Sequence, residues 1–272
     1  MKKSLIAVAL AAGFAAPAFA QTAPAAETSV HTFTGNLTIA SEYRFRGISQ
    51  TAFRPAIQGG VDYSHASGFY VGNWNSNVDP SAGYPDGNIE MDFYGGYKTA
   101  FGDFGLDVGG IYYYYPGSSY TPLGQSKADV VTNKELYIGG SWKFLSAKWY
   151  YSVDDYFSAK GWDSAGNATG KSTRGSNYFD LSAAFDLGDG WGVNAHYGVL
   201  NFKNGHNGDY NDWKLGVTKD INGWVIGAAY IGTDAKASRN ASTAQPYLFT
   251  KTGGYQYDSG KDTVVVSLSK TF

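Results

Sequence analysis

Apolar and polar residues alternate along most of this chain with a period of two. In residues 177–187 the two sets oppose each other: Phe179, Leu181, Ala183, Phe185 and Leu187 against Tyr178, Asp180, Ser182 and Asp186. Residues 33–47 repeat the pattern and place Phe33, Leu37, Ile39, Tyr43 and Phe45 on the apolar face. No segment after the N-terminal 20 residues keeps a helical period of 3.6. The pattern therefore predicts β-strands with one apolar and one polar face.

About twelve segments carry this pattern. They are residues 33–47, 54–64, 68–77, 88–98, 103–115, 134–144, 147–157, 177–187, 191–201, 210–219, 223–232 and 262–272. Every second connection between them is short, and those in between are mostly long and polar. Short periplasmic turns and long external loops are typical of barrels that cross the bacterial outer membrane. The fold predicted is an all-β transmembrane barrel of about 12 antiparallel strands in up-and-down order.

Segment length and barrel closure support a membrane location. The segments are mostly 10 to 13 residues long, which matches a tilted crossing and exceeds the usual soluble strand. A sheet with open edges cannot exist in lipid, because lipid offers its edge groups no hydrogen bonds. The chain ends in Phe272, with apolar residues at alternate positions before it, as in the C-terminal signal recognised by the barrel-assembly machinery; Lys270 departs from that signal. The alternative fold is a secreted or periplasmic β-sandwich.

Composition fits this picture. Charged residues make up 16% of the chain and aromatic residues 17%, with 36 glycines and no cysteine. The mean hydropathy of −0.29 excludes a helical membrane protein, and the aromatic content excludes disorder. The absence of cysteine excludes disulfides, thiolate metal sites and a cysteine nucleophile. The formal net charge of −2 argues against nucleic acid as a partner.

The N-terminus has the three parts of a secretory signal peptide. Lys2 and Lys3 precede an apolar stretch, and Ala18-Phe19-Ala20 provides a cleavage site before Gln21. We therefore expect a signal peptide at residues 1–20, a flexible segment at 21–32 and the barrel at 33–272. Export predicts a location in the bacterial outer membrane, in contact with its lipid and lipopolysaccharide.

Several segments resemble the TorF family of porin-like proteins, which are small proteobacterial outer-membrane barrels. The matching pieces are Tyr43-Arg44-Phe45-Arg46-Gly47-Ile48-Ser49, Ile57-Gln58-Gly59-Gly60, Gly68-Phe69-Tyr70-Val71-Gly72 with Ser76-Asn77, and Tyr113-Tyr114-Tyr115-Pro116. Their spacing extends the resemblance over nearly all of the chain after the signal peptide. The resemblance implies a porin-like barrel and supplies no catalytic residue and no defined substrate.

Charged residues gather on the face predicted to line the lumen. Near the external end of the first hairpin this face carries Glu42, Arg44, Arg46 and Arg54, and a nearby strand adds Glu90 and Asp92. Opposed basic and acidic groups create the transverse field of a porin constriction. The same residues also fit a salt-bridged plug that fills the barrel. These six residues are the predicted pore-lining site.

The leading hypothesis is a narrow porin that passes small hydrophilic solutes or ions by passive diffusion, since twelve strands enclose an intermediate lumen. The alternatives are a closed barrel that acts as a structural protein or receptor through its external loops, and a barrel hydrolase using His196 or His206. The sequence shows no metal-ligand spacing, and we predict no cofactor, no metal and no catalytic residue.

Overall fold

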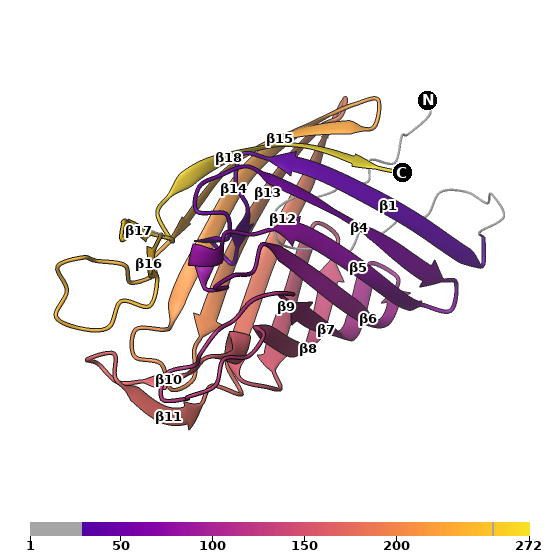
Figure 1. The fold of residues 1–272 in the computed structure, drawn as a ribbon. Helices are drawn as coiled ribbons and strands as arrows, with labels where there is room; N and C mark the ends of the chain where they lie inside the picture. The colour runs from indigo at the N-terminus through magenta and orange to yellow at the C-terminus, as the bar shows by residue number, and fades with distance from the viewer. Residues whose placement is uncertain (1–28, 252) are drawn as a thin grey trace.

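The computed structural model describes residues 29–251 and 253–272, and these form a closed antiparallel barrel (Figure 1). The barrel strands follow one another in chain order around the wall. They are β1 (His31–Ala40), β4 (Ala56–His65), β5 (Phe69–Asn77), β6 (Ile89–Phe101), β7 (Phe104–Tyr114), β8 (Thr132–Trp142), β9 (Leu145–Ser152), β12 (Asn177–Gly188), β13 (Trp191–Asn201), β14 (Tyr210–Ile221), β15 (Trp224–Thr233) and β18 (Thr263–Thr271). β18 pairs with β1 and closes the ring. The predicted all-β barrel of about 12 strands is confirmed.

The two ends of the barrel differ in their connections. Short turns join the strands at one end, which also holds the C-terminus, and long loops join them at the other (Figure 1). The long loops carry two hairpins, β10 (Lys160–Trp162) with β11 (Ala168–Ser172) and β16 (Leu248–Thr250) with β17 (Gln256–Asp258). They also carry two single 3-10 turns, η1 (Pro80–Ala82) and η2 (Tyr156–Ser158). Within the described residues no helix has the length and hydropathy to span a membrane.

Side chains alternate between the outside and the lumen, as the period of two requires. On β8 the apolar Leu136 and Ile138 are more than half exposed on the outside, whereas Glu135 and Tyr137 are buried inside. A surface that exposes large apolar side chains all around a barrel suits contact with lipid. The predicted signal peptide lies outside the described residues, as does most of the predicted flexible segment.

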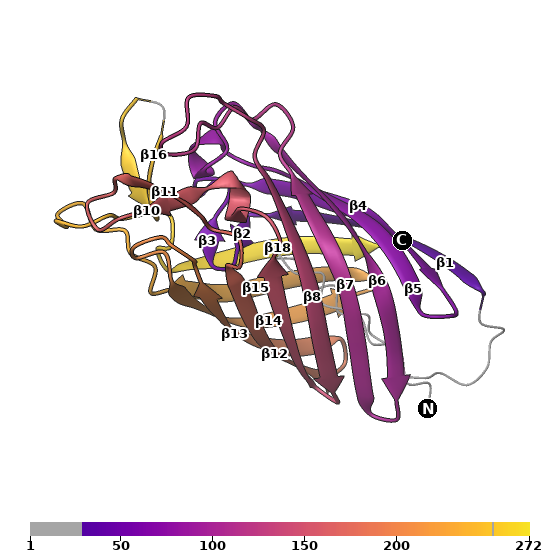
Figure 2. The same cartoon turned by 90° about the horizontal axis from the view of Figure 1, so that it is seen from below.

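The first predicted strand is shorter than expected. The sequence pattern runs to residue 47, but β1 ends at Ala40, and the chain then turns into the barrel. Residues 42–52, hereafter the plug, are buried without a break and include the small hairpin of β2 (Arg44–Phe45) and β3 (Ile48–Ser49). Figure 2 shows this hairpin between the walls at the long-loop end. The prediction that Tyr43 and Phe45 continue the apolar face of this strand is therefore wrong; both lie in the interior.

Glycines pair directly in the wall between β6 and β7, where Gly95 faces Gly110 and Gly96 faces Gly109. A Cβ on Gly96 would lie 2.3 Å from the backbone oxygen of Val108, whereas one on Gly110 would meet nothing closer than 3.4 Å. We therefore expect Gly96→Ala to lower the free energy of unfolding by roughly 1–3 kcal/mol, because an overpacked site must shift. Gly110→Ala is the matched control and is expected to change it little. Denaturant unfolding of both variants checks this, and equal effects would contradict it.

Candidate functional site

The plug is built around a tight turn at Arg46 and Gly47. Both residues have positive φ, 48° and 76°, as a two-residue hairpin turn of the primed type requires. There is also no room for a side chain at Gly47, because a Cβ there would lie 2.3 Å from Cγ2 of Thr233 on the barrel wall. Arg46 adopts the left-handed conformation at a cost, and such a conformation persists only where surrounding contacts fix it. Arg46 is the residue through which the plug is fixed to the wall.

Arg46 forms a buried ion pair with Glu135 of β8. Its two terminal nitrogens lie 3.0 and 2.7 Å from Oε1 and Oε2 of Glu135, and both side chains are fully buried. The Tyr156 hydroxyl, from η2, is a third partner at 2.9 Å from Nη1. The guanidinium also lies over the ring of Tyr178 at 4.3 Å. This two-pronged geometry gives the hairpin tip one defined position in the lumen.

A second arginine holds the base of the plug. Arg44 lies 2.9 Å from Glu42 and donates to the backbone oxygens of Gly47, Ser259 and Lys261. Burial raises the pKa of Glu42, and the neighbouring Arg44 opposes that rise. Arg44 thus joins the first loop to the last one, which lies beside it at the long-loop end.

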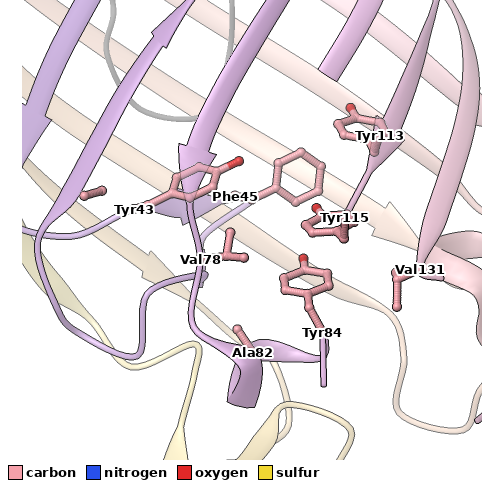
Figure 3. Close-up of a cluster of buried hydrophobic side chains, with 9 residues drawn as sticks. Tyr43, Phe45, Val78, Ala82, Tyr84, Tyr113, Tyr115 and Val131 are labelled. Carbon is pink, nitrogen blue, oxygen red and sulfur yellow. The ribbon is translucent and has the colours of Figure 1, made fainter. Parts of the chain in front are cut away.

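Aromatic side chains fill the space between the plug and the wall. Figure 3 shows Tyr43 and Phe45 of the plug beside Tyr113 and Tyr115, with Tyr84 below. The rings of Tyr84 and Tyr115 stack with centroids 3.8 Å apart. Phe45 packs edge-on against Tyr113. These side chains form a packed cluster between the plug and this part of the wall.

The structure places the six predicted site residues at three locations. Glu42, Arg44 and Arg46 belong to the plug rather than to a strand, and Arg54 is exposed on the rim beside Asp79 at 3.4 Å. Glu90 and Asp92 face the lumen from β6 and are buried. The acidic partner of Arg46 is Glu135, not Glu90 or Asp92 as the sequence led us to expect. Glu90 instead accepts a hydrogen bond from Tyr43 at 3.2 Å.

The lumen below the plug, towards the short turns, is polar and charged. Lys148 pairs with Asp107 at 2.7 Å, and the Tyr70 hydroxyl donates to the same carboxylate at 2.6 Å. Lys98 lies over the ring of Tyr70 at 4.2 Å, and among the described residues it has no acidic partner within ion-pair distance. Lys98 and Lys148 keep partial exposure. This half of the barrel therefore presents charge to the space inside it.

His196 lies between two carboxylates in the lumen. Its Nδ1 is 3.1 Å from Asp180 and its Nε2 is 2.9 Å from Asp212. Ser182 lies 3.3 Å from Nδ1 but donates its proton to Asp180 at 2.7 Å. A general base must accept the proton of its nucleophile, and here both ring nitrogens already face carboxylate oxygens. The arrangement supports a structural ion-pair network more than nucleophile activation.

In the part of the chain that the structure describes, no group of three or more acidic or histidine side chains is placed to hold a metal ion. His206, the other histidine considered from sequence, lies in the connection between β13 and β14, outside the lumen network.

Sequence reasoning missed how the plug is anchored. The pairing of Arg46 with Glu135 joins residues 89 positions apart in the sequence, which no local pattern reveals. Tyr156 falls within the predicted strand segment 147–157, but β9 ends at Ser152 and Tyr156 lies in η2, in a loop that folds into the barrel. The Arg46-Gly47 pair was the available signal, because a two-residue segment that ends in glycine and lies between apolar residues, here Phe45 and Ile48, is typical of a hairpin turn.

Comparison with solved structures finds outer-membrane porin barrels. The KdgM porin superposes with a TM-score of 0.50 at 8% identity, covering 88% of this chain and 99% of that one. The NanC porin superposes with a TM-score of 0.50 at 9% identity, covering 89% and 99%. At such identities the likeness shows the fold alone. A search of curated proteins finds no relative of this chain.

At the level of sequence, a family profile matches nearly all of the chain after the predicted signal peptide. The family is described as "Bacterial protein of unknown function (Gcw_chp)", and the match covers residues 24–272. The chain belongs to this family.

Proposed function

We propose that this protein is a narrow channel of the bacterial outer membrane, through which small hydrophilic solutes or ions diffuse passively. The plug is the constriction, and the long-loop end faces outward. The observation that supports the proposal most strongly is that the two halves of the lumen differ. The half towards the short turns is charged and partly exposed, and a single inserted hairpin lies above it. Lys98, which is partly exposed in this half and has no ion-pair partner among the described residues, supports a water-filled lumen there.

The size of the barrel supports the same function. Eight strands leave room only for side chains, and sixteen or more leave a wide aqueous channel. Twelve strands with an inserted loop give a passage whose width the loop determines. The resemblance to the TorF family, the predicted signal peptide and the C-terminal Phe272 agree with assembly in the outer membrane.

The proposal is tested by recording currents across planar bilayers that contain the purified, folded protein. The expected result is small, discrete current steps, since the plug narrows the lumen without removing its charged lower half. Protein of verified fold that gives no steps would contradict the proposal.

Lumen charge should set the ion preference. Neutralising Lys98 by Lys98→Gln removes a positive charge that faces the lumen without a direct acidic partner among the described residues. We expect the reversal potential in a salt gradient to shift towards cation preference. Lys134→Gln is the control for loss of a positive charge outside the lumen, because Lys134 lies on β8 with its side chain outside the barrel, half exposed and paired with Asp154 at 3.0 Å. A reversal potential that is unchanged in Lys98→Gln, or shifted equally in both variants, would count against this selectivity.

One observation favours a second candidate function. Residues 42–52 are buried without interruption, as expected for a closed barrel that acts as a structural protein or receptor through its external loops. The two candidate functions predict different currents from the wild-type protein. Silence in the wild type, with current only after the plug is removed, supports the closed barrel.

A further inference from the structure

Two carboxyl groups lie side by side against the plug. Glu90 and Asp92 occupy successive inward positions of β6, and their side chains interact directly. Glu90 is fully buried and Asp92 is 6% exposed. Among the described residues neither forms an ion pair with a basic side chain, and Arg46 of the plug is already paired with Glu135. Acidic side chains therefore outnumber basic ones at this level of the lumen.

The oxygens of this acid pair, Glu90 and Asp92, lack hydrogen-bond donors. Oε2 of Glu90 and Oδ1 of Asp92 are buried, and no described residue donates a hydrogen bond to either atom. Ionised carboxylates only accept hydrogen bonds, so two of them can bond to each other only when one holds a proton. Two neighbouring negative charges shielded from water are also unfavourable. The closed structure is therefore that of an acid pair that retains at least one proton.

The acid pair contacts the plug directly. The Tyr43 hydroxyl of the plug donates to Glu90 at 3.2 Å. The Tyr43 ring also packs edge-on against Trp74, which lies opposite Asp92 in the register of β5 and β6. Ionisation of both carboxyls favours the entry of water at this point, and the buried plug is what excludes water from it. A change of charge on the acid pair therefore acts on the plug.

The other titratable groups around the acid pair do not change charge near neutral pH. They are Tyr43 and Arg46 of the plug, Tyr84 of the β5–β6 connection, Tyr94 of β6, Tyr113 and Tyr115 at the end of β7, and Glu135 of β8. Tyrosine ordinarily ionises only at about pH 10, and Glu135 is held in its ion pair with Arg46. Among the described residues at this level, a change of charge near neutral pH is therefore confined to Glu90 and Asp92.

The plug has little structure of its own to keep it in place. Arg46 and Ala52 have φ values of 48° and 51°, and Phe53, which follows the plug, has 64°. Such left-handed conformations persist only where surrounding contacts fix them. The β2–β3 hairpin has only two residue pairs. Loss of contacts with the wall is therefore expected to release the plug.

We propose that the acid pair is a proton switch for the plug. The plug stays in the lumen while Glu90 and Asp92 together carry at most one negative charge, and it is released when both are ionised. Protons are lost as the pH rises, so the passage widens at alkaline pH and narrows at acid pH. This regulation rests on the proposed function, because a released plug changes the current only if the barrel is a channel.

The first test records currents across planar bilayers at about pH 5 and about pH 9, on either side of the range in which buried carboxyls lose their protons. Wild-type steps are expected to be several-fold larger at the higher pH. Glu90→Gln and Asp92→Asn, made separately, each limit the acid pair to one negative charge and should give small steps at both pH values. Either variant suffices if the other does not fold. Asp62→Asn is the control, because Asp62 is a partly exposed lumen carboxylate that accepts from Tyr94 at 2.6 Å, and it should respond as the wild type does.

A labelling experiment follows the plug without requiring current. The chain has no cysteine, and Ser49 of the plug is fully buried, so Ser49→Cys introduces one protected thiol. At the higher pH a water-soluble maleimide should label this thiol several-fold faster in the wild-type background than in the Glu90→Gln or Asp92→Asn background. Comparison of backgrounds at one pH cancels the pH dependence of the thiol itself.

Two results from the currents would overturn the switch. They are wild-type steps that do not grow with pH, and steps that grow equally in the acid-pair variants, as a response arising elsewhere in the lumen would. An absence of current at every pH would contradict the proposed function, and the labelling rates would then decide on the switch. Faster labelling in the wild-type background supports it, and equal rates in all backgrounds overturn it.

Discussion

Removing the plug is expected to increase the rate at which small sugars enter liposomes that contain the barrel. The variant replaces residues 42–52, the whole plug, by a short glycine–serine linker. Ala40 and Ala56 pair directly across β1 and β4, so a short linker bridges the gap without disturbing the wall. Tyr43, Phe45 and the two arginines leave with the plug and water takes their place, while the aromatic side chains of the wall remain. Liposome swelling in sugars of increasing size measures the change, and the size limit is expected to rise.

A control is needed for shortening a long loop. Residues 236–245 are a suitable choice, because they belong to the last long loop and are mostly exposed rather than inserted in the lumen. Their replacement by the same linker is expected to leave swelling rates at the wild-type level. Equal rates for the wild type and the plug-deleted protein would contradict the assignment of the plug as the constriction.

Replacing Arg46 by alanine is expected to have the largest effect on stability of any single substitution in the plug. Arg46→Ala leaves the carboxylate of Glu135 fully buried without its guanidinium partner. Breaking a buried ion pair from one side typically costs about 3–5 kcal/mol of unfolding free energy. Denaturant unfolding of the protein in detergent micelles measures the loss.

Two further variants separate the ion pair from simple loss of packing. Arg46→Met combined with Glu135→Leu removes both charges and keeps apolar volume, so it should recover most of the stability. Arg54→Ala breaks the exposed pair with Asp79 and is expected to cost at most about 1 kcal/mol. A loss in Arg46→Ala no larger than in Arg54→Ala would show that the buried pair does not fix the plug.

The barrel itself was predictable because a strand in its wall has two chemically distinct faces. Residues 191–201 were predicted as a strand and form β13 with the same bounds. Residues 68–77 and 223–232 alternate poorly, because glycines and asparagines interrupt their pattern, yet they also form strands, β5 and β15. For these two segments, the regular alternation of short and long connections indicated a strand where the hydropathy pattern did not.

The plug was not predictable from alternation. Tyr43 and Phe45 continue the apolar face of β1 in sequence, and an apolar side chain facing lipid has the same pattern as one packed inside a barrel. The basic residues Arg44 and Arg46 were correctly expected in the interior, but their partners depend on how a loop folds back. Glu135 lies on the barrel wall, 89 residues from Arg46 in the sequence. Only the three-dimensional structure therefore identifies the pair.

The outward-facing asparagines show a further limit of pattern reasoning. The alternation of β5 is weak because its outward positions are Asn73, Asn75 and Asn77 rather than apolar residues. The weak alternation was thus the only sign in the sequence that the outward face of β5 is partly polar. The register with β4 and β6 was required to show that these side chains lie on the outside.

The central claim is that the barrel is a channel whose passage the plug narrows, and single-channel recording tests it most directly. Wild-type and plug-deleted proteins, purified together and shown to be folded, are recorded in the same salt across planar bilayers. We predict small steps from the wild type and steps several times larger from the variant. Steps of the same size from both proteins, or none from either, would contradict the account.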